Sequence, residues 1–445
     1  MVLSSGSRPA ARMDTQAEGA VGQAAPSRRL AKGERCGMRD IDLYSRLLLL
    51  EEPWFVDEIE MDEQGGEIHV MVEMRGGAKL ACPECGQADC AVKDRRPRAW
   101  RHLDTCQFKT LIHGLVPRIE CPTCGVKTVE PPWAHKHSRF TLLFERLAVM
   151  ALQEMSVKGS CRLLGITWDE ADTIMARAVE RGLARRDLSG LRRIGIDEKS
   201  VGKGQNYVTI VHDLDTSKVV WVGVDRTQET LDRFFAMLGP EGCARIECLA
   251  MDMWEPYRAS CRRWIADADN KTVLDRFHLD KHLNEAVNDV RKAEHRALKE
   301  QGIELLKGSR YDWLYRPENL PPESEARFNE LRQYDLQTVR AWAIKENFRH
   351  FWTYVYEANA RKFFDQWHFW ATHSRLKPII AAAKRMKKHL ERIITYFRHR
   401  VTNATAEGIN NKIQSVTKKA YGFRNRQRFI NAIYFHCAGL QLCPL

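Results

Sequence analysis

The stretch "RRIGIDEKSVGKGQNYVTIVHDL", residues 192–214, decides the fold of this chain. Its apolar run and the alternating run that follows predict a buried β-strand and a second strand after it. The first strand carries an aspartate, Asp197, in an otherwise apolar context. Burying a carboxylate is costly unless something cationic pairs with it. Asp197 therefore predicts a nearby arginine, lysine or metal ion.

The segments that follow predict a mixed α/β core. The patterns "NYVTIVHDL" and "KVVWVGVD" indicate two strands, "TQETLDRFFAML" a helix, "IECLAMDMWEPY" a strand ending near Asp252, and "KTVLDRFHL" a short strand around Val273. Three strands, a helix, a strand, a helix and another strand is the order of an RNase H-like core. In such a core the first and fourth strands are neighbours, so Asp197 and Asp252 would meet.

Two carboxylates forced together repel each other unless a cation lies between them. Mg²⁺ takes carboxylate oxygens, water and substrate phosphate as ligands, and two such ions about 3.5–4 Å apart can stabilise both oxygens of a phosphoryl displacement. Glu407, on a predicted helix in a cationic segment, is the candidate third acid. Taken singly, Asp197 is as well explained as a strand-end acid and Glu407 as an ion-paired surface residue. Glu198 should point to the opposite face from Asp197 and is a less favoured ligand.

One region carries all of the excess positive charge. The 445 residues contain 70 Lys and Arg against 58 Asp and Glu, for a net charge of +12. Residues 375–428 alone hold 15 Lys and Arg against two acids. Such a region suits phosphate backbones, although solvated basic helices are also common. The candidate DNA contacts in this region are Asn410, Lys412, Lys418, Lys419 and Arg424.

The remaining composition narrows the class of protein. No apolar run approaches the ~18 residues that a membrane span needs, and no signal peptide is visible. Residues 1–37 are rich in Ala, Gly, Ser and Arg and predict a disordered tail. Thirteen cysteines without an export signal favour reduced thiols or metal ligands over disulfides.

Two C-x-x-C-G knuckles, "CPECG" and "CPTCG", predict a zinc site. The glycine of each knuckle permits the tight turn that aims both sulfurs at one point. Four thiolates from two knuckles bind zinc tetrahedrally. The predicted zinc ligands are Cys82, Cys85, Cys121 and Cys124.

We place the zinc ribbon at residues 77–134, after an α/β segment at residues 38–76. The ribbon could be purely structural. Alternatively, its basic stretch "KDRRPRAWRH", with Arg95, Arg96 and Arg98, could contact DNA.

Residues 138–186 predict a helix-turn-helix DNA-binding domain. The pattern "SVKGSCRLLG" indicates a short helix that ends at Gly165, and "TWDE" a capping box between Thr167 and Glu170. Helix, glycine-containing turn and helix is the outline of this motif. The second helix opens with acids that would repel phosphates, and its arginines, Arg177 and Arg181, come late. A plain helical bundle is therefore the alternative.

A helical insertion is expected between Asp252 and Glu407. We divide the RNase H-like core into a first part at residues 190–278 and a second part at residues 396–445, with an all-helical insertion at residues 279–395 between them. Steps of four and three residues give one apolar helix face; it consists of Leu279, Leu283, Ala286, Val290, Ala293 and Ala297. Tryptophans are plentiful in the insertion, and most should pack its core.

From Met38 to its C-terminus the chain resembles the bacterial insertion-sequence transposases with an Asp-Asp-Glu (DDE) core, most closely the ISL-three group. The resemblance rests on six motifs in order: the paired knuckles with "WRHLD" between them, "EMSVKGSCRLLGIT", "GIDEKSVGKGQNY", "MDMWEPY", "DRFHL" and "EGINNKIQSVTKKAYGF". It implies that Asp197, Asp252 and Glu407 are catalytic metal ligands. It also implies that Asp275 and His278 are active-site accessories, although His278 could equally cap a helix.

The resemblance further implies a transposase that binds the terminal inverted repeats of its element and catalyses phosphodiester hydrolysis and strand transfer. Its cofactors would be two Mg²⁺ ions, or Mn²⁺, and a Zn²⁺ ion in the ribbon. It would act on double-stranded DNA as at least a homodimer, in the bacterial cytoplasm at the nucleoid and away from membranes. Two alternatives stay open: a non-catalytic sequence-specific DNA-binding protein, and a structure-specific nuclease of the same fold.

Overall fold

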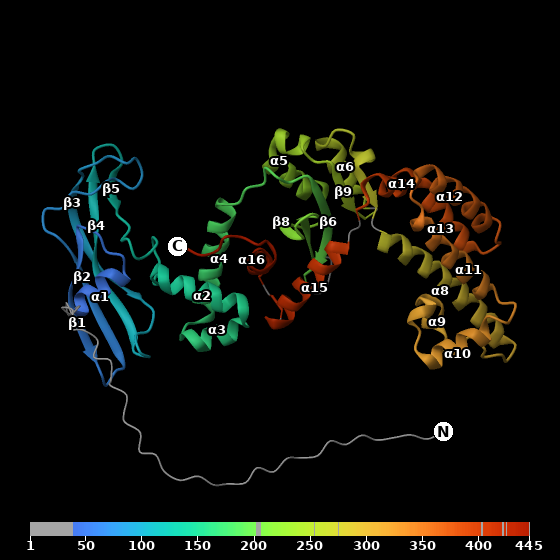
Figure 1. Ribbon diagram of the computed structural model, residues 1–445, viewed down its shortest axis with the longest axis horizontal. Helices are drawn as coiled ribbons and strands as arrows, with labels where there is room; N and C mark the ends of the chain where they lie inside the picture. The colour runs from blue at the N-terminus through green and yellow to red at the C-terminus, as the bar shows by residue number, and fades with distance from the viewer. Residues whose placement is uncertain are drawn as a thin grey trace, which may run out of the picture.

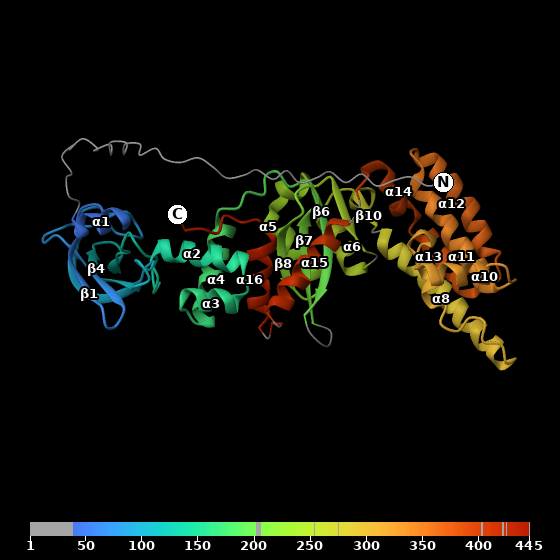
Figure 2. The same cartoon turned by 60° about the horizontal axis from the view of Figure 1, so that its bottom comes forward.

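The structure, a computed structural model, describes residues 39–201, 206–252, 254–274, 276–401, 404–420, 422–423 and 425–444. They form an elongated molecule: a sheet domain, a small helical domain, a central α/β core and a second helical domain follow one another along its length (Figure 1). The same succession is visible after rotation about the long axis (Figure 2). Among the described residues, no helix combines the length and hydrophobicity that a membrane span requires.

The N-terminal domain is a five-stranded sheet with one helix. Its strand order is β1-β2-β4-β3, with β5 paired to β4. The strands of the predicted 38–76 segment therefore share a sheet with those of the ribbon, because β2 pairs in parallel with β4. The elements are α1 (Asp40–Leu47), β1 (Trp54–Asp62), β2 (Glu67–Met74), β3 (Ala91–Arg101), β4 (Lys109–Cys121) and β5 (Gly125–Thr128).

Three helices form the next domain: α2 (Leu142–Glu154), α3 (Val157–Leu164) and α4 (Trp168–Ala184). Each begins at a Thr or Ser whose side chain accepts a hydrogen bond from the first turn. The expected capping box of α4, between Thr167 and Glu170, is present. Gly165 has φ 64° and ψ 37°, a left-handed conformation that suits glycine and lets the chain turn between α3 and α4.

The central core is a five-stranded sheet in the order β10-β9-β6-β7-β8. The first and fourth strands of this core, β6 and β9, are neighbours and parallel, as the sequence predicts. The elements are β6 (Arg193–Ser200), β7 (Tyr207–Asp213), β8 (Lys218–Val224), α5 (Gln228–Ala244), β9 (Cys248–Met251), α6 (Glu255–Trp264), α7 (Ala268–Lys271), β10 (Thr272–Leu274), α15 (Ala404–Lys419) and α16 (Arg426–Cys437).

Alternate side chains of the core sheet face different partners. Val211 and Val220 pack with Phe234 and other residues of α5 and α6. Ile210 belongs instead to a second cluster, which includes Phe429 of α16 and residues of α2, α4 and α15. The sheet is thus covered on both sides, and one cover is shared with the three-helix domain.

Between β10 and α15 lies the predicted helical insertion. Its elements are α8 (Arg276–Glu300), α9 (Arg310–Leu314), η1 (Pro317–Asn319), α10 (Pro322–Leu331), α11 (Gln337–Phe348), η2 (Arg349–Thr353), α12 (Glu357–Thr372), α13 (Lys377–Lys388) and α14 (Leu390–His399).

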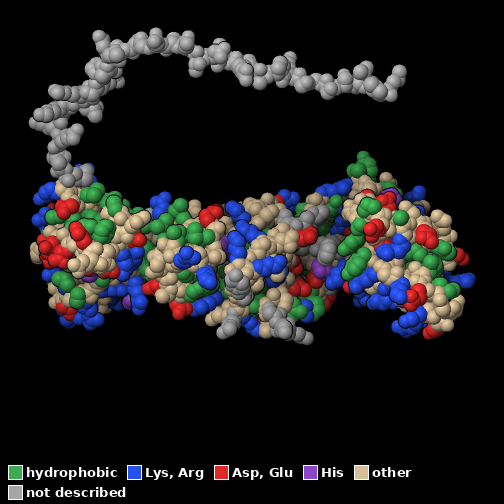
Figure 3. Space-filling model, turned by 90° about the horizontal axis from the view of Figure 1, so that it is seen from below, with side chains coloured by type: hydrophobic (Ala, Val, Ile, Leu, Met, Phe, Trp, Pro, Cys, Tyr) green, Lys and Arg blue, Asp and Glu red, His purple; other side chains and the backbone are tan. Residues whose placement is uncertain are grey.

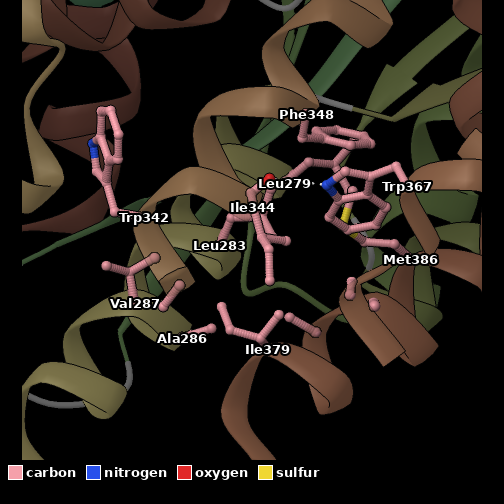
Figure 4. Close-up of a cluster of buried hydrophobic side chains, with 14 of the residues drawn as sticks. Leu279, Leu283, Ala286, Val287, Trp342, Ile344, Phe348, Trp367, Ile379 and Met386 are labelled. Atoms are coloured by element: carbon pink, nitrogen blue, oxygen red, sulfur yellow. Dashed lines mark hydrogen bonds between the residues drawn. The ribbon is translucent and has the colours of Figure 1, made fainter. Parts of the chain in front are cut away.

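The apolar face of α8 packs into the core of the insertion, where Leu279, Leu283 and Ala286 meet α11, α12 and α13 (Figure 4). The indole N–H of Trp367 donates to the carbonyl of Ile344 at 2.9 Å in this core. The predicted apolar face of α8, however, includes two residues that the structure does not bury. Ala293 and Ala297 are exposed, and the second half of α8 packs through other positions, with Leu298 against the core and Glu294 bonded to Thr338 of α11.

Candidate active site and nucleic-acid interface

Asp197 and Asp252 lie at the same level of two neighbouring strands. In the parallel pairing of β6 with β9, Gly195 is opposite Ala250. Continuing that register by two residues sets Asp197, in β6, opposite Asp252, which directly follows β9. The sheet therefore brings together two acids that are far apart in the sequence.

The carboxylate of Asp197 is partly buried and held by two donors. Its Oδ2 accepts from the side-chain amide of Asn410 at 2.6 Å, and its Oδ1 accepts from the peptide N–H of Glu198 at 2.8 Å. Burial raises the pKa of Asp197; the hydrogen bonds and the charge of His278 lower it, and the charge of Asp252 raises it. Burial and the mutual repulsion of the two carboxylates are the costs that a divalent cation between them would offset.

The carboxylate of Asp252 accepts a hydrogen bond from the backbone that follows it. One of its oxygens, Oδ1, accepts from the peptide N–H of Trp254 at 2.9 Å. The tight turn from β9 into α6 places this N–H two residues beyond the acid. The backbone of the segment after β9 therefore helps to orient this carboxylate.

Glu407 reaches this site through α15. It lies three residues before Asn410 and hence on the same side of the helix, where Cβ atoms are about 5–6 Å apart. Its side chain is exposed. Among the described residues, the three acids do not form a group with all ligand atoms within 4.8 Å of one another. The structure thus places the two aspartates opposite each other and Glu407 one helical turn from Asn410, which contacts Asp197. It does not bring the three acids close enough together to share one metal ion.

The residues around the pair fit a divalent cation. The side-chain oxygen Oδ1 of Asn410 is buried and has no hydrogen-bond partner among the described residues. An orphaned oxygen beside two carboxylates matches the oxygen donors that hard cations and their water ligands prefer. Of the two accessory residues, His278 on α8 acts electrostatically on Asp197, and Asp275 lies outside the described residues.

Glu198 interacts electrostatically with the aspartate pair. Burial raises the pKa of Glu198 to about 7, and the charges of Asp252 and Asp197 contribute to the shift. Its cationic partner is Arg226, at 3.8 Å. Glu198 is therefore electrostatically part of the site, and no sequence pattern identified Arg226 as its partner because the two residues are joined only by the sheet.

The four predicted zinc ligands converge in the N-terminal domain. The sulfurs of Cys82, Cys85, Cys121 and Cys124 all lie within 4.8 Å of one another, and those of Cys85 and Cys121 are 3.6 Å apart. Tetrahedral zinc with Zn–S bonds of about 2.3 Å requires sulfurs about 3.8 Å apart. Peptide N–H groups of Cys124 and Thr123 lower the pKa of Cys121 to about 6, which favours a thiolate. The donor set fits Zn²⁺.

Comparison with known families agrees with this arrangement. A family model described as a transposase of the ISL3 type matches residues 194–433, more than half of the chain. The chain belongs to transposase family ISL3. The helix-turn-helix domain of this family matches residues 129–179, and the zinc finger of the transposases of IS204, IS1001, IS1096 and IS1165 matches residues 79–129.

Two relatives extend the match over nearly the whole transposase. It is 29% identical to the transposase for insertion sequence element IS1557 of Mycobacterium tuberculosis, over 90% of this chain and 96% of the relative. It is 26% identical to the transposase for insertion sequence element IS1001 of Bordetella parapertussis, over 84% of this chain and 93% of the relative. The chain is thus a DNA-binding DDE transposase with a zinc ribbon, and its family implies a divalent metal at the core.

The arginines of α4 have an internal role in this transposase. Arg177 and Arg181 lie 3.1 and 3.8 Å from the fully buried carboxylate of Glu145. Arg181 also donates two hydrogen bonds to the carbonyl of Leu442. DNA contact by these two arginines stays a prediction, and the structure engages both in holding α2, α4 and the C-terminal segment together.

The acids that open α4 also face the protein. Asp169 and Asp172 lie 2.9 and 3.1 Å from the guanidinium of Arg428 on α16. These acids had counted against DNA contact because they would repel phosphates. Their pairing with Arg428 offsets part of this negative charge and links α4 to α16.

The other predicted DNA contacts differ in accessibility. On β3, Arg95 and Arg96 are exposed, whereas Arg98 donates to the carbonyl of Ser138 at 3.2 Å. On α15, Lys412, Lys418 and Lys419 are exposed. Arg424 lies outside the described residues, and Asn410 contacts Asp197. Lys and Arg side chains gather over the central core on the face seen from below (Figure 3).

Proposed function

We propose that this transposase cuts the ends of its element and joins them to target DNA with Asp197, Asp252 and Glu407 as its catalytic acids. The observation that carries the proposal is the register that sets Asp197 opposite Asp252, with α15 bringing Asn410 onto Asp197. Glu407 lies one turn away on the same helix face. The mixed α/β core and the exposed lysines of α15 support a substrate with a phosphate backbone.

The three acids would hold two divalent ions, Mg²⁺ or Mn²⁺, which supply charge stabilisation for an in-line phosphoryl displacement when bound. Water would attack the phosphodiester at the end of the element and free a 3′-hydroxyl. That hydroxyl would then attack the target strand. Asn410 would keep the Asp197 carboxylate oriented, and the turn at Trp254 would do the same for Asp252.

The ribbon and the helix-turn-helix domain would bind the terminal inverted repeats. Because two ends must be cut and joined together, we propose that the protein acts as at least a homodimer on DNA. The site of action would be the bacterial cytoplasm, at the nucleoid. Light scattering of the protein with end duplexes tests the assembly, and a monomeric complex at full occupancy would contradict it.

The decisive test replaces Asp197 by Asn and measures binding, end cleavage and strand transfer on duplexes that carry the inverted repeat. We expect binding to persist and both reactions to be lost. The exposed Asp335, replaced by Asn in the same way, is the control and should leave all three unchanged. An Asp197→Asn protein that still cuts would refute the catalytic assignment. Cleavage of branched DNA without joining would favour a structure-specific nuclease instead.

A further inference from the structure

The side chain of Arg226 packs against two aromatic rings. The guanidinium carbon of Arg226 lies 4.1 Å from the ring centroid of Tyr207 and 4.6 Å from that of Trp254. The indole N–H of Trp254 also donates to the carbonyl of Arg226 at 3.0 Å. Both the backbone and the side chain of Arg226 are therefore fixed in place.

The same contacts tie Arg226 to both catalytic aspartates. Trp254, which stacks on Arg226, holds Asp252 through its peptide N–H at 2.9 Å. Glu198, which lies 3.8 Å from Arg226, is the neighbour of Asp197 in β6. The guanidinium therefore lies next to the segment that holds Asp252, at the end of the sheet that carries the aspartate pair.

The guanidinium also keeps its capacity for hydrogen bonds. Within the part of the chain that the structure describes, its N–H groups make no hydrogen bond, because the 3.8 Å separation from Glu198 is too long for one. The side chain is 30% exposed. The two aromatic rings hold the guanidinium in place, and its exposed part leaves N–H donors available to a ligand. An arginine held in this way is preorganised for bidentate binding of a phosphate.

Before metal ions bind, a cation at this place would reduce the repulsion between the acids and DNA. The carboxylates of Asp197, Asp252 and Glu198 would repel a DNA backbone that approached them. Arg226 is the cation paired with Glu198. A permanently charged donor at this edge would draw a phosphodiester toward the aspartate pair.

We propose that Arg226 binds a DNA phosphate next to the scissile bond. The inference rests on the proposed catalytic role of Asp197 and Asp252, which places the scissile bond at this end of the sheet. Arg226 is then a substrate-binding residue that determines where the strand lies. A purely structural Arg226, which only neutralises Glu198, is the competing outcome.

The test compares the effect on binding affinity of changing the protein, of changing the DNA and of changing both together. Binding of a duplex with the terminal repeat is measured without added Mg²⁺, for the wild type and for Arg226→Gln. Single neutral methylphosphonates replace each phosphate around the cleavage site in turn. Loss of a charge-assisted hydrogen bond should weaken binding of Arg226→Gln to unmodified DNA about 10- to 100-fold. The salt dependence of binding should fall by about one charge.

The phosphate scan decides between the two roles. At one phosphate, the methylphosphonate should weaken the wild type as much as the substitution does, and should leave Arg226→Gln unaffected. Additive effects at every phosphate would overturn the proposal. The matched control is Arg263→Gln on α6, whose parent side chain is 66% exposed and paired with Asp232; it should bind as the wild type does.

A second variant keeps the test decisive if Arg226→Gln does not fold. Arg226→Lys keeps the charge between the rings but loses the bidentate edge, so the same phosphate should show a smaller, still non-additive effect. This scan measures binding only. If the Asp197→Asn protein cleaves DNA, the proposed catalytic role of Asp197 is wrong. If the effects of Arg226→Gln and of the methylphosphonates are additive at every phosphate, only the proposed role of Arg226 is wrong.

Discussion

Replacing Asn410 by Ala should impair cleavage by disturbing Asp197. The amide of Asn410 donates to Oδ2 of Asp197 at 2.6 Å, across the junction between α15 and β6. Its own Oδ1 is buried and has no protein partner among the described residues. The substitution therefore removes the donor that orients one of the proposed catalytic carboxylates, together with an oxygen acceptor beside it.

The expected size of the effect follows from that contact. A hydrogen bond to a charged group contributes about 1.5–3 kcal/mol. This corresponds to a cleavage rate about 10- to 150-fold lower at limiting Mg²⁺. Groups that orient metal ligands typically change metal affinity or activity about 10- to 100-fold, which agrees. Because the lost group orients the ligand rather than replacing it, excess Mg²⁺ should restore part of the rate.

The measurement is single-turnover end cleavage across a series of Mg²⁺ concentrations. Asn411→Ala is the matched control: the residue is adjacent on α15, its side chain is exposed, and the hydroxyl of Ser415 donates to its backbone carbonyl, which the substitution keeps. DNA binding and thermal unfolding should be close to wild type for both variants. If Asn410→Ala cleaves at the wild-type rate with the same Mg²⁺ dependence, Asn410 does not position Asp197 and the reasoning fails.

Three further predictions concern other parts of the chain. Glu145→Ala should lower the free energy of unfolding by about 1.5–3 kcal/mol, because it removes the buried carboxylate that two partly buried arginines bind; urea unfolding checks this against exposed Glu154→Ala, and equal midpoints would contradict it. Cys121→Ser should abolish stoichiometric zinc in a chromophoric chelator assay, whereas Cys106→Ser, outside the cluster, should keep it. Phe348→Ala should cost about 3–5 kcal/mol because the ring is 1% exposed, and Phe369→Ala, at a ring that is 64% exposed, about 0.5 kcal/mol or less.

The strand order and the zinc ligands could be predicted because each depends on local pattern. A strand such as β6 shows its apolar run in the sequence, and the order of strands and helices restricts which strands can be neighbours. The knuckles show their ligand spacing directly. Even the capping box of α4 is a four-residue signal, and the structure contains it.

Contacts between distant segments could not be predicted, because no local pattern in the sequence indicates them. Nothing near Arg226 in the sequence indicates Tyr207 or Trp254 as its neighbours, because three separate segments meet only after the sheet forms. The acids of α4 are a similar case. Asp169 and Asp172 face Arg428, more than 250 residues later, so their effect on DNA contact could not be judged from α4 alone.

The contact between α4 and α16 bears on how the transposase sets its cleavage position. One hydrophobic cluster contains Ile174 of α4, Ile210 of the core sheet, Ile413 of α15 and Phe429 of α16. The helix-turn-helix domain and the catalytic sheet therefore share a core instead of being joined by a free linker. Since α15 carries Asn410 to Asp197 at one place and packs in this shared core at another, the proposed function predicts that this packing fixes the distance from the bound repeat to the cleaved bond. A substitution that weakens the packing of this shared core should then make the cleavage position less precise before it abolishes cleavage.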